Sequence, residues 1–343
     1  MSISKANIKK ILIIMLGGIG NMIMLTPALR AVRGEYKDAK IYLLVGPYGA
    51  ENVVKGSDLV DEVIIYNLRK TRLFDLIGKI KREHFDLSIS ATGINPLKTG
   101  LIIFLGGIKY RLGEDIKRRG WFYNIKAHYF NEIHEVDANI KLVEHLGIKV
   151  NNKSLYLHTS EKDKEFASQF LSAKRVVSKN PLVAIHPGSG VHQAGFKRWP
   201  VERFAELADE IIKEHNARIL ILGGKEEIGL EEKMVSLMKN EPILTAGRFS
   251  LSRTAALIEN CHLLIGNDSG LMHIACAVRT PAVAIFGPTD YKKTAPYSNS
   301  AVIVRKDLPC SPCYSKGRVK CKTLECFKTI TVEDIMLKVR ERF

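Results

Sequence analysis

The chain has 343 residues, of which 46% are hydrophobic and 26% charged, and a formal net charge of +16. This length suits two globular domains, and the longest apolar runs, such as 11–19 and 101–108, are too short to span a bilayer. The positive charge is compatible with nucleic acid, an anionic membrane or negatively charged small substrates, but aromatic and clustered basic residues are not interleaved along most of the chain, which argues against nucleic acid.

Short apolar strands alternate with amphipathic helices in the first half. Strands are expected at 9–15, 40–45, 62–66, 85–90 and 108–111, and helices at 21–34, 72–83, 97–105 and 135–146. This alternation predicts a parallel sheet with right-handed crossovers. No small-residue cleavage site follows the first apolar run, so we expect a core strand rather than a signal peptide, and a cytoplasmic protein.

The same pattern restarts after a polar segment at 160–181 that contains a helix at 161–172. Strands are expected at 182–186, 218–222, near 243, at 262–265 and at 281–286, and helices at 200–215, 226–239, 251–259 and 333–340. The sequence therefore predicts two similar α/β domains, 1–175 and 181–330, followed by a C-terminal helix within 331–343. A cleft between the two domains is the expected ligand site.

The turn Asp268-Ser269-Gly270 is the most informative segment, because it joins an apolar strand to a helix of small residues. Backbone N–H groups and the helix dipole at such a start favour an anion, which predicts a phosphorylated ligand. His273 lies on the same helix face as Ser269. It either reaches the phosphate or the acceptor, or packs in the core.

Glycine-rich turns follow two other strands. In the turn 16–21, Gly18 and Gly20 permit close approach of another molecule, or serve packing alone. Its spacing does not fit a dinucleotide fingerprint, which argues against an NAD-linked dehydrogenase. The loop 186–190, which includes Ser189, lies where ligands bind in open α/β sheets.

Two charged positions lie close to these turns. Lys197, ahead of a helix, either neutralises a diphosphate or is solvated. Glu226 and Glu227 follow a glycine pair, where a carboxylate either binds a ribose hydroxyl or complements a helix dipole.

Two further segments have an open interpretation. Residues 109–123 place five basic side chains before Trp121, Phe122 and Tyr123, which suits a lipid headgroup region or an ordinary solvated loop. Four cysteines in a basic tail can bind zinc, but their second pair is loosely spaced and no histidine supports it. We therefore favour free or reversibly oxidised thiols. These are Cys310, Cys313, Cys321 and Cys326.

Nearly the whole chain resembles glycosyltransferase family 9, the lipopolysaccharide heptosyltransferases. The resemblance rests on the segments 20–30, 186–189, 197–200, 268–273 and 286–289 and on the cysteine tail. It implies a GT-B fold, in which the parallel sheets of two Rossmann-like domains face each other across a cleft. It also implies inverting transfer of a sugar from a nucleotide-sugar, typically ADP-heptose, with no metal or other cofactor. The expected acceptor is a lipid-linked or surface glycan at the inner membrane face, with peripheral contact to anionic lipid.

The resemblance also assigns site residues. It places Lys197 at the diphosphate, Glu227 near the ribose, Phe249 in the adenine pocket and the phosphate-binding turn at 268–271. The expected donor-binding residues are Ser189, Lys197, Glu227, Phe249, Asp268, Ser269, Gly270, Leu271 and His273. Those expected on the acceptor side, in the first domain, are Gly18, Gly20 and Asp115.

One position departs from the family pattern. Asn21 stands where the family usually has an aspartate that serves as general base, and an amide cannot accept the proton. Three alternatives stay open: another base such as Asp115 or His273, a phosphate oxygen of the leaving group, or binding without transfer. The rival functions are accordingly a non-catalytic nucleotide-sugar-binding protein and a GT-B sugar-nucleotide epimerase.

Overall fold

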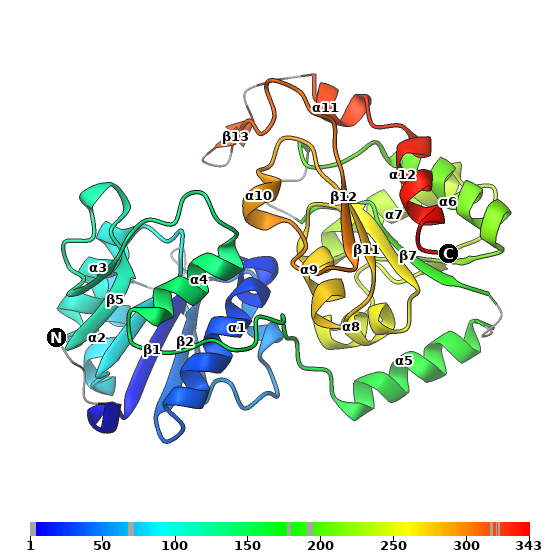
Figure 1. The fold of residues 1–343 in the computed structure, drawn as a ribbon. Helices are drawn as coiled ribbons and strands as arrows, with labels where there is room; N and C mark the ends of the chain where they lie inside the picture. The colour runs from blue at the N-terminus through cyan, green and yellow to red at the C-terminus, as the bar shows by residue number, and fades with distance from the viewer. Residues whose placement is uncertain are drawn as a thin grey trace. The chain divides into compact units, whose positions relative to one another are not determined.

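The computed structural model describes residues 5–67, 72–176, 180–190, 195–315, 318–319, 321 and 323–343. The chain divides into two compact units, Met1–His158 and Thr159–Phe343 (Figure 1). Each unit has a six-stranded parallel sheet flanked by helices. The predicted α/β class, with two Rossmann-like domains, is confirmed.

The first unit follows the expected alternation. Its elements are β1 (Lys10–Met15), α1 (Ile19–Glu35), β2 (Lys40–Val45), β3 (Glu62–Ile65), α2 (Leu73–Glu83), β4 (Leu87–Ser90), α3 (Pro96–Leu105), β5 (Tyr110–Glu114), β6 (Ile125–Ala127) and α4 (Glu135–Glu144). The sheet order is β3-β2-β1-β4-β5-β6. Leu12 and Ile14 of β1 pack with Ile80 of α2 and Ile103 of α3. Because side chains alternate along a strand, Ile11 and Ile13 point to the opposite face, and α1 packs against α4 outside this cluster.

The second unit repeats the arrangement. It contains α5 (Glu161–Ala173), β7 (Leu182–His186), α6 (Val201–His215), β8 (Arg218–Ile221), α7 (Ile228–Leu237), β9 (Ile243–Leu244), α8 (Leu251–Glu259), β10 (Leu263–Asn267), α9 (Gly270–Ala277), β11 (Ala282–Ile285), α10 (Tyr291–Thr294), β12 (Ala301–Val304), β13 (Tyr314–Ser315), β14 (Arg318–Val319), α11 (Glu325–Lys328) and α12 (Val332–Arg340). The large sheet has the order β12-β11-β10-β7-β8-β9, and β13 pairs with β14 in an antiparallel hairpin.

Both faces of the second sheet are covered, so β7, β10 and β11 are buried along their whole length. On one face, α6, α7, α11 and α12 pack in a single cluster with the strands. Trp199 and Phe204 lie in this cluster with ring centroids 4.9 Å apart, nearly perpendicular to each other. Helix α8 contacts both α9 and α5, outside this cluster (Figure 1).

Counted within each unit, both sheets have the strand order 3-2-1-4-5-6 of a doubly wound fold. The order reverses between β1 and β4 in the first unit and between β7 and β10 in the second. Ligands bind at the carboxyl ends of the strands at such a reversal. The glycine-rich turns after β1 and β7, and the turn after β10, are therefore at the positions that the fold provides for ligands.

Some predicted boundaries differ from the structure. The division between the units falls at His158 and Thr159, before the expected linker, because α5 packs on α8 of the second unit. Helix α12 also belongs to the second unit, since it packs on α6. The short elements β6, β12, α10, α11 and the β13–β14 hairpin were not predicted, because runs of two to four residues carry too little periodicity. No helix among the described residues is long and apolar enough to cross a membrane.

The cluster around α6 yields a prediction for stability. Phe204 is fully buried, so Phe204→Ala removes a ring and leaves a cavity between α6 and Trp199. We expect the free energy of unfolding of the second unit to fall by about 3–5 kcal/mol in urea titrations. Leu337→Ala on α12, where the side chain is 52% exposed, is the matched control and should lower it by less than about 1 kcal/mol. Equal losses in the two variants would contradict the assignment of this core.

Candidate functional site

The candidate site lies at the carboxyl edge of the second sheet, where β7 and β10 are neighbours although they are far apart in sequence. Three loops lie at this edge, each following a strand: 186–190 after β7, 222–227 after β8 and 267–270 after β10. The segment 196–199, which precedes α6, joins them through the contacts described below. This edge gathers most of the predicted donor-binding residues.

The Glu227 side chain, 7% exposed, holds these loops together. Its Oε1 accepts hydrogen bonds from the N–H groups of Ser189 and Gly190 at 2.9 and 3.1 Å. Its Oε2 accepts one from the N–H of Gly224 at 2.9 Å and one from His186 Nε2 at 3.0 Å. These donors fill the acceptor positions of the carboxylate. A ribose hydroxyl can reach it only in exchange for one of them, so the contact with ribose stays a prediction.

The surroundings of Glu227 favour the ionised form of its carboxyl group. Burial acts to raise its pKa, but the hydrogen bond and charge of His186 and the amides of Gly224 and Gly190 outweigh burial and hold the pKa well below its ordinary value. The loop after β7 must pass very close to this carboxylate. A Cβ at Gly188 would lie 1.9 Å from Oε1, so only glycine fits there.

The same histidine connects Glu227 to the start of α9. His186 Nδ1 lies 3.0 Å from Ser269 Oγ. Because Nε2 donates to the carboxylate, the imidazole ring links Glu227 directly to the Ser269 hydroxyl through its second nitrogen. Ser269 is the N-cap of α9, but its side chain makes no capping hydrogen bond. The backbone N–H groups at the start of the helix are therefore not capped by this hydroxyl and suit an anion.

A second buried side chain fixes the spacing between the loops. Asn267, the last residue of β10, is fully buried. Its Nδ2 donates to the carbonyl oxygens of Pro187 and Gly188 at 2.8 and 3.1 Å, and its Oδ1 accepts from the N–H of Trp199 at 2.9 Å. The loop after β7 and the segment that carries Lys197 are thereby tied to one side chain. Sequence reasoning did not single out this residue, although it is a polar residue that ends an apolar strand.

Lys197 lies beside the start of α9. Its Nζ is 2.9 Å from Asp268 Oδ2, and the two side chains are 15% and 8% exposed. The ammonium group also lies 5.6 Å from the ring centroid of Tyr314, which stacks on Phe196 at 5.4 Å. The N–H groups of Cys313 and Tyr314 both donate to the carbonyl of Pro288, which holds the tail in this position. An anion that binds here contacts the same ammonium group of Lys197 that already contacts the carboxylate of Asp268.

Two polar groups at this edge were not predicted as ligands. Arg198 Nη2 lies 3.6 Å from Glu227 Oε1, and its Nε is buried without a hydrogen-bond partner among the described residues. Thr289 Oγ1, in the loop after β11, is likewise buried and has no partner within that part of the chain. Buried groups of this kind suit the oxygen atoms of a polar ligand. The available signals were the position of Arg198 next to Lys197 and of Thr289 in the segment 286–289.

The structure places the remaining residues that were predicted to bind the donor as follows. Gly270 and Leu271 form the first turn of α9, and His273 lies one turn into the helix and is 3% exposed. The ring of Phe249 packs against Phe166 and Phe170 of α5, with centroids 4.9 and 5.1 Å away. The predicted contact of Phe249 with adenine stays a prediction.

The residues predicted on the acceptor side lie at the carboxyl edge of the first sheet. Gly18 is the N-cap of α1, and Asn21 is exposed in the first turn of that helix. A Cβ at Gly17 would lie 2.8 Å from the Asn21 side chain, so the asparagine lies over the turn. Asp115 follows β5 and accepts a hydrogen bond from the N–H of Gly120 at 2.7 Å, which closes its own loop. Asn21 lies in the helix that follows β1 and Asp115 in the loop that follows β5, and β4 lies between these two strands in the sheet.

The cysteines of the tail are free thiols of unequal exposure. Cys310 is exposed, whereas Cys326 is buried, and burial together with the nearby thiols raises the pKa of Cys326 to about 11. Among the residues that the structure describes, no group of three or more His, Cys, Asp or Glu is placed to hold a metal ion. The possible zinc site at Cys310, Cys313, Cys321 and Cys326 therefore has no support from these side chains.

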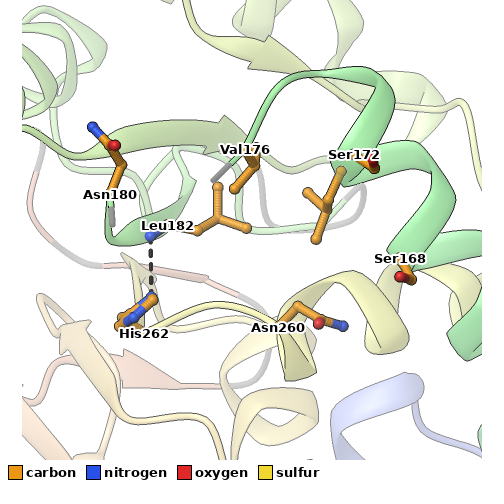
Figure 2. Close-up of a pocket in the computed structure, with 8 residues that line it drawn as sticks. Ser168, Ser172, Val176, Asn180, Leu182, Asn260 and His262 are labelled. Atoms are coloured by element: carbon orange, nitrogen blue, oxygen red, sulfur yellow. Dashed lines mark hydrogen bonds between the residues drawn. The ribbon is translucent and has the colours of Figure 1, made fainter. Parts of the chain in front are cut away.

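A pocket at the opposite, amino edge of the second sheet provides a contrast (Figure 2). Ser168 and Ser172 of α5 and Asn260 line it, and His262 accepts a hydrogen bond from the N–H of Leu182 at 3.1 Å (Figure 2). No lysine, arginine or acidic side chain is among the described residues that line it. A diphosphate needs positive charge, so the carboxyl edge is the better candidate.

Two doubly wound units in one chain, each with a six-stranded parallel sheet, match the GT-B fold. A comparison with known protein families identifies the family within this fold. The model of glycosyltransferase family 9 (heptosyltransferase) matches residues 73–323, so the chain belongs to this family and is a glycosyltransferase.

Similar proteins cover nearly the whole chain. Lipooligosaccharide heptosyltransferase 2 of Campylobacter jejuni is 26% identical over 329 residues, which are 94% of this chain and 96% of the relative. Lipopolysaccharide heptosyltransferase 2 of Escherichia coli is 26% identical and covers 86% of this chain and 88% of its own. The solved structure of Escherichia coli ADP-heptose heptosyltransferase II has a TM-score of 0.77 at 23% identity, over 97% of this chain and 98% of that one.

The contacts of Glu227 generate a prediction. Glu227→Gln places an NH2 group, which cannot accept, opposite backbone N–H donors. We expect the free energy of unfolding of the second unit to fall by about 3 kcal/mol at pH 7, measured in urea. Glu226→Gln changes an exposed neighbour and should cost less than about 0.5 kcal/mol.

The pH dependence has a definite sign. Because folding lowers the pKa of Glu227, the carboxylate stabilises the fold above its unfolded pKa of about 4.3, and this stabilisation is lost as the pH falls further. The difference between wild type and Glu227→Gln should therefore be largest near neutral pH and shrink below pH ~4. A difference that grows with acidity would show that this linkage is wrong.

Proposed function

We propose that this glycosyltransferase transfers heptose from ADP-heptose to a hydroxyl group of a lipid-linked or surface-glycan acceptor in lipopolysaccharide biosynthesis, with inversion and without a metal ion. The observation that carries the proposal is the start of α9 beside the Lys197–Asp268 pair, at the strand-order reversal of the second sheet. The names of the relatives, which include an ADP-heptose heptosyltransferase, support the sugar and the nucleotide.

The donor diphosphate is proposed to lie at the N-terminus of α9. There the backbone N–H groups of the first turn, Lys197 and Arg198 supply hydrogen bonds and positive charge. Asp268 holds Lys197 in place at 2.9 Å and reduces its net charge, so the diphosphate binds by sharing the ammonium group. Glu227 acts by positioning the loops, through its bonds to Ser189, Gly190 and Gly224.

The proposed reaction is one direct displacement. An oxygen of the acceptor attacks the anomeric carbon from the face opposite the diphosphate, and the bond between that carbon and the phosphate oxygen breaks. The electron pair of this bond goes to the leaving ADP, where Lys197 and the start of α9 stabilise the developing charge. Attack from the opposite face inverts the configuration at the anomeric carbon.

Three alternatives are open because residue 21 is an asparagine: two destinations for the proton of the acceptor hydroxyl, and binding without transfer. Asn21 cannot accept this proton and is proposed to orient the acceptor by hydrogen bonds. A second group such as Asp115 or His273 takes the proton, or a phosphate oxygen of the leaving group takes it. The third alternative is that the donor is bound and not transferred.

The two units are proposed to divide the substrates. The first unit binds the acceptor near Gly18, Gly20 and Asn21, and the second binds the donor. We further propose that the reaction takes place in the cytoplasm at the inner membrane face, because the acceptor is anchored in lipid.

The role of Lys197 is tested by calorimetry with ADP. Lys197→Ala should weaken binding by roughly 10- to 100-fold, because a charge-assisted hydrogen bond contributes about 1.5–3 kcal/mol. Lys213→Ala, at a side chain that is 74% exposed on α6, is the control and should leave affinity unchanged.

Asp268→Asn is not expected to weaken the binding of ADP, in contrast to Lys197→Ala. It removes the carboxylate that shares Lys197 and repels phosphate, so ADP should bind as tightly as to wild type or more tightly. Circular dichroism checks that each variant is folded. Unchanged affinity in Lys197→Ala, or weaker binding in Asp268→Asn, would contradict the shared-lysine arrangement.

The proton acceptor is tested with Asn21→Asp. If proton removal does not pass through residue 21, turnover of ADP-heptose with an acceptor glycan should stay within about threefold of wild type. Asn151→Asp, an exposed position after α4, controls for the added negative charge.

Two other outcomes have clear meanings. A gain of about a hundredfold or more in Asn21→Asp alone would show that wild type lacks a carboxylate base, and would contradict proton removal elsewhere. Donor binding without turnover in wild type, across a panel of acceptors, would overturn the transferase proposal itself.

A further inference from the structure

Helix α3 of the first unit turns its large apolar side chains outward. Four of them are between 38% and 49% exposed. They are Leu97, Leu101, Phe104 and Leu105. Their spacing of four, seven and eight residues from the first places them on one stripe of the helix. The buried residues of the helix are Pro96, Thr99, Gly100 and Ile103, of which only Ile103 is a large aliphatic side chain. An exposed apolar stripe of this kind marks a surface that another body covers.

The loop after β5 extends this stripe. A Cβ at Gly100 would lie 3.1 Å from the Phe122 side chain, so the loop packs directly on α3. The rings of Phe104 and Phe122 are 5.4 Å apart, and Arg111 Nε donates to the carbonyl of Phe122 at 2.6 Å. Trp121, the residue before Phe122, is thereby held in place and is 71% exposed.

Basic side chains lie in the same segments as these apolar side chains. Five exposed basic residues lie on α3 or in the segments on either side of β5. They are Lys98, Lys109, Lys117, Arg118 and Arg119. Among the residues that the structure describes, none of them forms an ion pair with an acidic side chain, and the nearby Asp115 already accepts a hydrogen bond from the N–H of Gly120. Lys117 and Arg118 have φ of 53° and 57°, a region that favours glycine, so two cationic side chains stand where glycine would fit with less strain.

We propose that α3 and the loop 115–122, here called the α3 surface, dock on an anionic lipid bilayer. The apolar stripe and Trp121 enter the boundary between headgroups and acyl chains, while the lysines and arginines contact lipid phosphates. Charge complementarity selects lipid over a protein partner, because lysine is depleted at protein interfaces and is typical of membrane-surface segments. The proposal goes beyond sugar transfer and does not depend on it.

The full chain carries its own reporter for this surface. Its two tryptophans differ in environment, since Trp121 is 71% exposed and Trp199 is 1% exposed. With vesicles of phosphatidylcholine containing about a quarter phosphatidylglycerol, we expect co-sedimentation and a shift of tryptophan emission to shorter wavelength. Vesicles of phosphatidylcholine alone should give neither, and added salt should weaken the binding. Neither donor nor acceptor is needed, so failure here is distinguishable from failure of the proposed transfer.

Matched variants separate charge from apolar contact. The triple variant Lys117→Gln, Arg118→Gln, Arg119→Gln should lower partitioning by roughly 10- to 100-fold, because each basic residue near an anionic surface contributes a factor of about five. The control Lys37→Gln, Lys55→Gln, Lys149→Gln removes the same charge from exposed positions elsewhere in this unit and should change it by less than about threefold. Leu101→Ser should weaken binding, whereas Leu337→Ser on α12 should not.

Several results would overturn the proposal. These are equal binding to neutral and anionic vesicles, no binding to either, an unchanged Trp121 emission on bound protein, or equal effects of the two triple variants. A dimer in sedimentation velocity that Leu101→Ser dissociates would also overturn it, because a second copy of the chain would then cover the stripe.

Discussion

The buried carboxylate of Glu227 forms the interactions on which the candidate site of the second unit depends. It is ionised inside the protein because backbone N–H groups from two loops and one imidazole ring donate to it. The bonds run to the loop after β7, to the loop after β8 and, through His186 and Ser269, to the start of α9. A charge in this position would be unfavourable without these donors, so the loops and the carboxylate require one another.

This arrangement decides which groups can meet an anion. Ser269 directs its hydroxyl to His186, which leaves the first turn of α9 without a side-chain cap. Lys197 is held beside that turn by Asp268 and by the ring of Tyr314, and Asn267 fixes the backbone at Trp199, two residues further on. The positive groups are therefore in place before any ligand contributes energy, which is the condition for electrostatic stabilisation of a leaving group.

The first unit has the same sheet topology as the second, but its helix α3 leaves large apolar side chains exposed. The composition of α3 suggests a core helix, since most of its residues are apolar. The structure instead buries Thr99, Gly100 and Ile103 and leaves the large side chains outside. The small residue at position 100 makes room for Phe122, so the loop that carries Trp121 lies against the helix and widens the apolar surface.

The sequence by itself determined the local structure: the buried strands such as β1, β7 and β10, the helices between them, and the turn at 268–270. Each of these is encoded by periodicity, glycine placement and short-range capping chemistry, which act over a few residues. Only the tertiary structure decided which side chains meet. His186 and Ser269 are 83 residues apart, His186 and Glu227 are 41 apart, and Lys197 and Asp268 are 71 apart. Such contacts follow from the order of the strands in the sheet and from the face that each helix covers. The packing of α5 on α8, which places the domain boundary before α5, has the same origin. A local pattern of residues encodes neither the strand order nor the choice of face.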